Sequence, residues 1–311
     1  MSRATTRRRF LQATAATAAG VAAGDLPAFA QRPDGPNLIL VIVDSLRADA
    51  VYDRAVATPN IDELVFQGLH FTSAYPEAMP TVPARNSILG GRRTFPFRHW
   101  HDYPGLLDSP GWAPLRHVDD SLPAVLRRAG YWTAYVTDNP FLGFARPYAP
   151  LRHSVNSFVR TGGEIGGSHP ISSVPKNVLH HWLHPAISPE KRERVGKYLA
   201  NSRYWHDERR SFAAKVMKDA VRALEVGAWH RPFALIVDTY EPHEPWTPPP
   251  PYAELYGKWR GPEPAMPLYG KVDNWLAPSQ RGPVVRRLRE LYAAEVTMTD
   301  RWLGSLFDRL H

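Results

Sequence analysis

The stretch LILVIVD, residues 38–44, holds six consecutive apolar residues and ends abruptly at an aspartate. Continuous apolar runs rich in β-branched residues are typical of parallel strands buried on both faces of a sheet. We therefore predict a central parallel strand over 38–43. In such sheets the ligand site lies beyond the carboxyl ends of the strands, which is where Asp44 is placed.

The rest of the chain alternates between helix-like and strand-like segments. Helices are predicted from Thr58, from Asp120 or Ser121, over 207–226 and over 284–310, and further strands over 69–75, 131–137 and 233–237. Thr58 is the predicted cap of its helix, and Leu122 and Val125 lie on the predicted apolar face of the next one. Residues 145–190 and 245–282 are expected to be irregular. This order favours an α/β fold with a mostly parallel central sheet flanked by helices.

Composition excludes several classes of function. The 311-residue chain is 43% hydrophobic and 22% charged, as is ordinary for a globular protein. Cysteine is absent, so disulfides, zinc–thiolate sites and cysteine nucleophiles are excluded. The net charge is +8 without a lysine-rich stripe, and we expect no nucleic-acid partner. A membrane-spanning helix needs about 18 consecutive apolar residues, and no run after the N-terminal segment is that long. We therefore expect no stable membrane span.

Residues 1–30 have the pattern of a twin-arginine signal peptide. The run Thr6-Arg7-Arg8-Arg9-Phe10-Leu11 precedes an alanine-rich segment, and Ala28-Phe29-Ala30 is a small-x-small cleavage site. A short N-terminal helix is the alternative interpretation. We therefore expect the twin-arginine translocase as a partner, a mature domain over 31–311, and a periplasmic or extracellular location.

The stretch Thr81-Val82-Pro83-Ala84-Arg85 opens a predicted helix and leaves two interpretations of Thr81. A hydroxyl at this place commonly caps the helix. The amino end of a helix also binds anions through free N–H groups and the helix dipole. A threonine there, with Arg85 one turn away, could instead attack a phosphorus or sulfur centre. The local sequence does not choose between the two interpretations.

Two further polar residues follow predicted strands. A carboxylate at Asp44 is costly unless it caps the next turn, is paired or binds a cation. His243 lies between Pro242 and Pro245 in a stiff loop after the strand that ends at Asp238. A surface histidine without a function is the alternative interpretation of His243.

In their order along the chain, these motifs resemble the sulfatase family of the alkaline phosphatase superfamily. The resemblance runs from about residue 36 to the C-terminus and rests on residues 36–49, 58–62, 68–75, 81–85, 238–246 and 292–301. Residues 81–85 stand where the family carries Cys/Ser-x-Pro-x-Arg. The resemblance implies an alkaline phosphatase-like fold and an exported, metal-dependent hydrolase of sulfate or phosphate esters. Its substrate would be a small anionic ester of a sugar, a lipid headgroup or an aryl group.

The resemblance also implies roles for four residues. Asp44 would ligate a divalent metal ion, Ca²⁺ or Mg²⁺, both of which favour carboxylate oxygens. Mn²⁺ or Zn²⁺ are alternatives, because Ser45 stands where the family often has a second aspartate. Thr81 would be the nucleophile, and Arg85 would hold the nucleophile and the anionic ester group. His243 would contact the ester or protonate the leaving oxygen.

The sequence departs from the family pattern at the nucleophile. Sulfatases oxidise a cysteine or serine to formylglycine, and threonine cannot supply that group. A threonine ester needs a second attack at its central atom, which phosphorus permits readily, so Thr81 favours phosphate esters. A lysine–histidine pair that many members carry is also missing, and Asp138-Asn139 stand near its place.

A second departure concerns the carboxyl-terminal end. The chain stops before the family's Asp-His-Gly motif, so we expect a C-terminally incomplete domain with an uncovered sheet edge. The alternative function is a truncated or degenerate, non-catalytic domain that binds an anionic sugar or lipid headgroup. Its binding residues would be Arg85, Arg92, Arg93, Arg98 and His243.

Overall fold

The computed structural model describes residues 35–310 apart from 53, 99, 145–147, 164–168, 186, 204–206 and 266–275. Its sheet has four parallel strands in the order β1-β4-β2-β3. The strands are β1 (Leu38–Val43), β2 (Trp132–Thr137), β3 (Ser157–Arg160) and β4 (Phe233–Thr239). The predicted α/β fold with a parallel sheet is confirmed. The predicted signal peptide lies outside the described residues.

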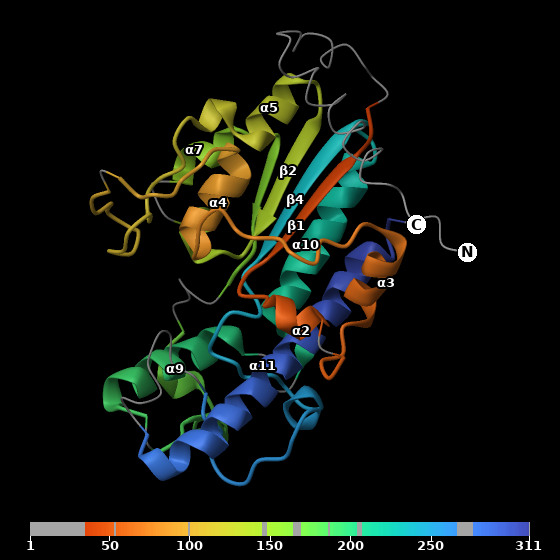
Figure 1. Ribbon diagram of the computed structural model, residues 1–311. Coiled ribbons are helices and arrows are strands. Elements are labelled where there is room, and N and C mark those ends of the chain that lie inside the picture. Colours follow the sequence, from red (N-terminus) through yellow and green to blue (C-terminus); the bar gives the residue numbers. More distant parts are fainter. Residues whose placement is uncertain are drawn as a thin grey trace.

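Helices cover both faces of this sheet. They are α2 (Ala48–Tyr52), α3 (Pro59–Gln67), α4 (Thr81–Gly90), α5 (Leu122–Arg128), α6 (Pro140–Phe144), α7 (Ala149–His153), α8 (Lys176–Trp182), α9 (Pro189–Ser202), α10 (Phe212–Gly227) and α11 (Pro278–Phe307). Figure 1 shows α10, α3 and the end of α11 on one side of the sheet, with α4, α5 and α7 on the other. The first half of α11 extends away from the sheet beside α9. None of the described helices is both long and apolar enough to cross a membrane.

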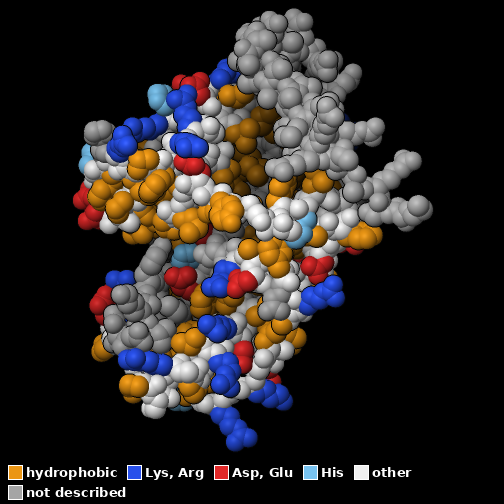
Figure 2. Space-filling model, in the orientation of Figure 1, with side chains coloured by type: hydrophobic (Ala, Val, Ile, Leu, Met, Phe, Trp, Pro, Cys, Tyr) orange, Lys and Arg blue, Asp and Glu red, His pale blue; other side chains and the backbone are white. Residues whose placement is uncertain are grey.

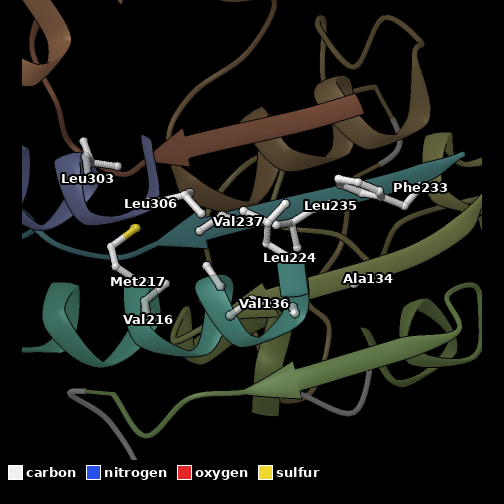
Figure 3. Close-up of a cluster of buried hydrophobic side chains, with 12 residues drawn as sticks. Ala134, Val136, Val216, Met217, Leu224, Phe233, Leu235, Val237, Leu303 and Leu306 are labelled. Carbon is white, nitrogen blue, oxygen red and sulfur yellow. The ribbon is translucent and has the colours of Figure 1, made fainter. Parts of the chain in front are cut away.

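Two apolar cores hold these layers together. In one, Val216 and Met217 of α10 pack with Leu235 of β4 and Leu306 of α11 (Figure 3). In the other, α4 contributes two buried side chains that pack against Tyr135 and Ile236 on the opposite face. Amphipathic helices on both faces bury the apolar side chains of each strand, which is the usual stabilisation of a parallel sheet.

The position of β1 differs from the prediction. Within the described residues β1 pairs with β4 alone, and its side chains are half-buried or exposed. Every residue of β4 is buried, and β4 pairs with both β1 and β2. The prediction that residues 38–43 form a central strand is therefore wrong, and β1 is an edge of the described sheet. An apolar run indicates a strand but does not state which strands lie beside it.

Three smaller predictions are also wrong. Residues 69–75 form no strand and are exposed, and residues 145–190 contain α7, β3 and α8 where irregular structure was expected. On α5, Leu122 and Val125 are exposed, because the helix turns Pro123 and Ala124 towards the protein.

The cap of α3 comes from a distant residue. Thr58 makes no side-chain capping bond. The carboxylate of Asp300 instead accepts hydrogen bonds from the backbone N–H of Asn60 at 3.1 Å and of Ile61 at 2.8 Å. Gly304 allows this close approach, since a Cβ there would lie 2.2 Å from the Asn60 side chain. Two of the motifs that carry the sulfatase resemblance therefore contact each other.

Candidate active site

The carboxyl ends of β1 and β4 bring two aspartates together. Because the strands are parallel neighbours, with Ile42 opposite Asp238 and Val43 opposite Thr239, Asp44 and Asp238 lie at the same edge of the sheet. Asp44 is 5% exposed and Asp238 is fully buried. Two buried carboxylates at one edge require a cation between or beside them.

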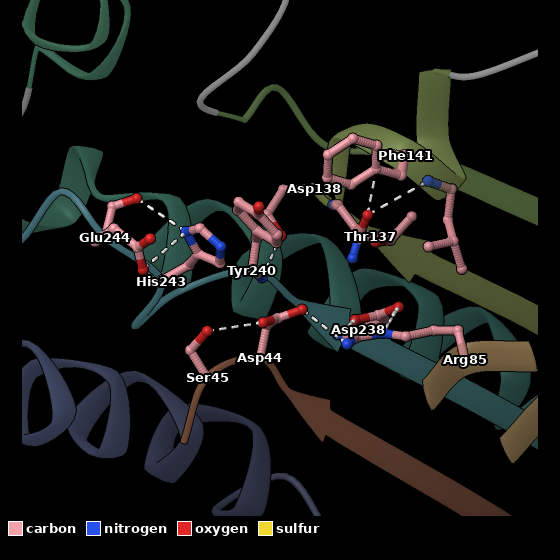
Figure 4. Close-up of polar contacts among 12 residues, drawn as sticks. Asp44, Ser45, Arg85, Thr137, Asp138, Phe141, Asp238, Tyr240, His243 and Glu244 are labelled. Atoms are coloured by element: carbon pink, nitrogen blue, oxygen red, sulfur yellow. Dashed lines mark hydrogen bonds and ion pairs between the residues drawn. The ribbon is translucent and has the colours of Figure 1, made fainter. Parts of the chain in front are cut away.

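Arg85 of α4 is that cation (Figure 4). Its Nη1 lies 2.7 Å from Oδ2 of Asp44. Its Nη2 lies 2.6 Å from Oδ1 of Asp238, and its Nε lies 3.2 Å from Oδ2 of the same carboxylate. Burial alone would lower the pKa of Arg85, but the charges of Asp238 and Asp44 outweigh it and raise the pKa above its usual value. Arg85 therefore stays charged and joins α4 to both strands.

Two hydroxyl groups donate to the two aspartates and hold their carboxylates in place. The Tyr135 hydroxyl donates to Oδ2 of Asp238 at 2.9 Å, and burial together with that negative charge raises the pKa of Tyr135. The Ser45 hydroxyl donates to Oδ1 of Asp44 at 2.9 Å. Ser45 has a φ of 56°, which is uncommon for a residue other than glycine. Its carbonyl accepts a hydrogen bond from the hydroxyl of Tyr292 on α11, which holds this turn.

Thr81 is the first residue of α4 and is 4% exposed. The N-cap position before it belongs to Pro80, which makes no side-chain capping bond, so the interpretation of Thr81 as the cap is wrong. N–H groups in a first helical turn lack partners within the helix and, with the dipole, favour an anion. Thr81 and Arg85 are four residues apart and so share one face of α4. The role of Thr81 as nucleophile stays a prediction.

His243 lies at the same edge of the sheet, and Figure 4 places Asp44 between it and Arg85. The imidazole is 5% exposed and stacks on the ring of Tyr240, with 4.2 Å between the ring centroids. Its Nδ1 lies 2.9 Å from the backbone oxygen of Glu244. A carbonyl oxygen can only accept, so Nδ1 carries the hydrogen in this contact.

Sequence analysis assigned no role to three buried polar residues, Asp138, Asn139 and Thr239, that follow or end β2 and β4. Within the described part of the chain, Oδ2 of Asp138, Nδ2 of Asn139 and Oγ1 of Thr239 are buried without a hydrogen-bond partner. The other carboxylate oxygen of Asp138 accepts from the Tyr240 N–H at 2.7 Å. Burial, with the negative charges of Glu241 and Asp238, raises the pKa of Asp138 well above its usual value. Unsatisfied polar atoms are rare in protein interiors, and a cluster of them marks a place for a polar ligand or water.

The described residues do not fit a divalent metal site. Among them, no group of three or more histidine, aspartate or glutamate side chains is placed to hold one ion. Oδ1 of Asp44 accepts from Ser45, and Oδ2 is ion-paired with Arg85 but has no hydrogen-bond partner among the described residues, so Asp44 could offer one carboxylate oxygen to an ion. Ca²⁺ takes six to eight oxygen ligands, and Mg²⁺ requires an octahedral set. In the described structure the positive charge beside Asp44 is therefore that of Arg85.

The basic residues Arg92, Arg93 and Arg98 do not join this site. They follow the carboxyl end of α4 and line a separate cavity, whose lining does not include Arg85 in the middle of that helix. The five residues predicted for a binding-only domain are thus divided between two places.

Comparison with known proteins agrees with this architecture. A family model described as Sulfatase matches residues 36–311. Human iduronate 2-sulfatase is 24% identical over 89% of this chain and 52% of its own length, so the chain spans about half of that relative. The structure of a phosphonate monoester hydrolase from Silicibacter pomeroyi superposes with a TM-score of 0.57 at 20% identity, over 89% of this chain and 59% of that one.

A second solved structure, of a protein in complex with its substrate D-glucosamine-2-N,6-O-disulfate, gives a TM-score of 0.54 at 15% identity. It covers 88% of this chain and 62% of that one. These likenesses show that the two proteins and this chain share the alkaline phosphatase-like fold. The family match extends over nearly all of the described residues and shows more than a shared fold. It shows that the chain belongs to the sulfatase family.

Proposed function

We propose that this chain forms part of an exported ester hydrolase in which Thr81 is the nucleophile and phosphate esters or diesters are preferred to sulfate esters. One observation carries the proposal. Thr81 begins α4 on the same face as Arg85, and Arg85 is locked against Asp44 and Asp238. A hydroxyl, a fixed positive charge and the free N–H groups of a helix thus converge on one place.

The reaction would proceed in two displacements. Oγ of Thr81 attacks phosphorus, its proton passes to solvent, and the bond from phosphorus to the leaving oxygen breaks. A protonated Nε2 of His243 donates a proton to that oxygen. Water then attacks phosphorus in the threonine ester and gives a proton to the now neutral Nε2 of His243, the phosphorus–Oγ bond breaks, and Oγ takes a proton from solvent as phosphate departs.

Arg85 would stabilise the charge that develops during both displacements. A guanidinium has five N–H groups. Within the described residues, three of them face Asp44 and Asp238, which leaves two for the oxygens of an ester. The carboxylates hold the guanidinium in place before the substrate arrives, which is how electrostatic preorganisation lowers a barrier.

Members of the sulfatase family generally use a divalent metal ion. Asp44 would offer one carboxylate to Ca²⁺ or Mg²⁺, with Mn²⁺ or Zn²⁺ as alternatives. The described residues supply no complete ligand set, and no step above depends on such an ion. Twin-arginine export to the periplasm or beyond is proposed from residues 1–30 alone.

The test compares two substrates and two variants. The protein is incubated with bis(4-nitrophenyl) phosphate or 4-nitrophenyl sulfate, with and without Mg²⁺ or Mn²⁺, and nitrophenol release is followed. We expect turnover of the phosphodiester, a loss of at least about 100-fold in Thr81→Ala, and no loss in Thr72→Ala, an exposed control. Acid-quenched samples should carry a phosphate ester on the peptide that contains Thr81.

Each part of the proposal has its own contrary outcome. Equal turnover by Thr81→Ala and the wild type contradicts the nucleophile. Turnover of the sulfate alone contradicts the preference for phosphorus.

A further inference from the structure

A cavity of about 250 Å³ lies at the opposite end of α4 from Thr81. Thr81 and Gly90 are the first and last residues of that helix, and Gly90 lines the cavity. At 1.5 Å of rise per residue, the helix separates them by about 14 Å. The cavity lining includes none of the candidate site residues Asp44, Thr81, Arg85, Asp238 and His243. The cavity is therefore distinct from the candidate active site.

The lining of this cavity is strongly basic. Four arginines and one histidine line it, and no aspartate or glutamate does among the described residues. Arg92 lies 3.3 Å from the carboxylate of Asp120. The other three, Arg93, Arg98 and Arg116, form no ion pair with a described carboxylate. Positive charges around one cavity repel one another when no negative charge lies beside them. An anion bound in the cavity would reduce that repulsion.

Aromatic rings form the other part of the lining. Phe97, Trp100 and Tyr103 all border the cavity. The indole nitrogen of Trp100 donates to the carbonyl of Trp112 at 3.3 Å, which fixes the ring. Gly111 has a φ of 85°, and a Cβ there would lie 2.6 Å from the ring of Phe97. The wall therefore depends on a glycine that lets Phe97 approach the backbone.

Asn86, which lines the cavity, is held in place by hydrogen bonds. Asn86 of α4 is 9% exposed and borders the cavity. Its amide donates to the carbonyl of Ala113 at 2.9 Å and its oxygen accepts from the Tyr148 hydroxyl at 2.7 Å. Figure 2 shows basic and hydrophobic side chains next to one another over the loop that follows α4 in Figure 1. A polar side chain held by hydrogen bonds, apolar rings and unpaired cations are the ordinary components of a small-ligand site.

We infer that this cavity binds a monosaccharide that carries a sulfate or phosphate group. The arginines would pair with the anionic group through charge-assisted hydrogen bonds. The aromatic rings would pack against the apolar face of the sugar ring. A volume of about 250 Å³ suits one ring with its charged substituent rather than a long oligosaccharide. Binding here is independent of Thr81 and of the proposed hydrolysis.

Isothermal titration calorimetry tests the inference with galactose 6-sulfate and glucose 6-phosphate as probes. Galactose and inorganic sulfate serve as probes that carry only the ring or only the charge. We expect the wild type to bind both sugar anions more tightly than either partial probe. The double variant Arg93→Ala/Arg98→Ala should lose affinity at least about tenfold, and Trp100→Ala should also weaken binding.

Control variants distinguish binding in this cavity from binding elsewhere on the protein. Arg194→Ala/Arg222→Ala removes two exposed arginines elsewhere and should leave affinity unchanged. Thr81→Ala should also bind normally. Because Trp100 packs in the wall, the exposed single variant Arg116→Ala repeats the test without touching the apolar contacts. The inference is overturned if the sugar anions bind no better than sulfate, if the control double variant weakens binding equally, or if Thr81→Ala alone abolishes it.

Discussion

Two buried arginines, Arg85 and Arg287, use their guanidinium groups differently. Arg287 places all five N–H groups on acceptors: the carboxylates of Glu263 and Glu290 and the carbonyls of Ala253 and Gly257. Within the described residues Arg85 donates two hydrogen bonds, both to Asp238, and forms an ion pair with Asp44 through Nη1, and Oδ2 of Asp44 is buried without a hydrogen-bond partner. A fully satisfied arginine holds a loop against a helix, whereas a partly satisfied one keeps donors for a ligand. The predictions below test this difference.

The largest effect is expected from Arg287→Ala. Removing this cation leaves the buried Glu263 carboxylate without a partner and frees two loop carbonyls. The free energy of unfolding should fall by about 3–5 kcal/mol, as measured by urea denaturation. Arg286→Ala, at the exposed neighbouring position, should change it by less than about 0.5 kcal/mol. Equal effects of the two variants would contradict the role of Arg287.

Arg85→Lys should separate stability from function. A lysine ammonium cannot bind Asp238 through two parallel hydrogen bonds while also reaching Asp44. The free energy of unfolding should therefore fall by about 2 kcal/mol. Turnover per folded molecule should be lost as well. Arg287→Lys is the matched control, in which turnover per folded molecule should be unchanged. If both variants keep turnover, Arg85 is a structural residue like Arg287.

Tyr135→Phe should have a smaller effect. It removes one hydrogen bond to Asp238, but Arg85 still pairs with that carboxylate. The expected loss is about 1 kcal/mol of unfolding free energy. The free guanidinium donors remain, so turnover should fall less than in Arg85→Lys. A loss of turnover as large as in Arg85→Lys would show that Tyr135 takes part in the reaction itself.

Much of the site could be predicted from local sequence. The apolar runs over 38–43 and 233–237 end at Asp44 and Asp238, and parallel strands place such ends together. The spacing of Thr81 and Arg85 on one helix likewise predicts a shared face. These inferences needed only the geometry of a single strand or helix.

The remainder depends on contacts between distant segments. The partners of Arg85 lie on two strands, and Asp238 is 153 positions away from it in sequence. The cap of α3 comes from Asp300, 240 positions beyond Asn60. The edge position of β1 depends on which strands pair, although all six of its residues are apolar. None of these partners is indicated by the residues on either side.

The last change is expected from Asp138→Asn, and its size should depend on pH. Burial and the charges of Glu241 and Asp238 raise the pKa of Asp138 in the folded state. Below the ordinary aspartate pKa the group is protonated in both states and has no effect. As pH rises, the unfolded chain ionises first, so stability falls until the raised pKa is passed. Asparagine keeps the hydrogen bond to Tyr240 but cannot ionise.

The variant should therefore gain stability relative to the wild type as pH increases from 4 towards neutrality. Urea denaturation across this range measures the difference, with the exposed Asp119→Asn as a control that should show no such trend. Thermal unfolding at the same pH values gives an independent check. A relative loss of stability at higher pH would mean that Asp138 is ionised and paired with a cation in the folded protein. The unsatisfied atoms around Arg85 would then belong to a cation site rather than to an anion site.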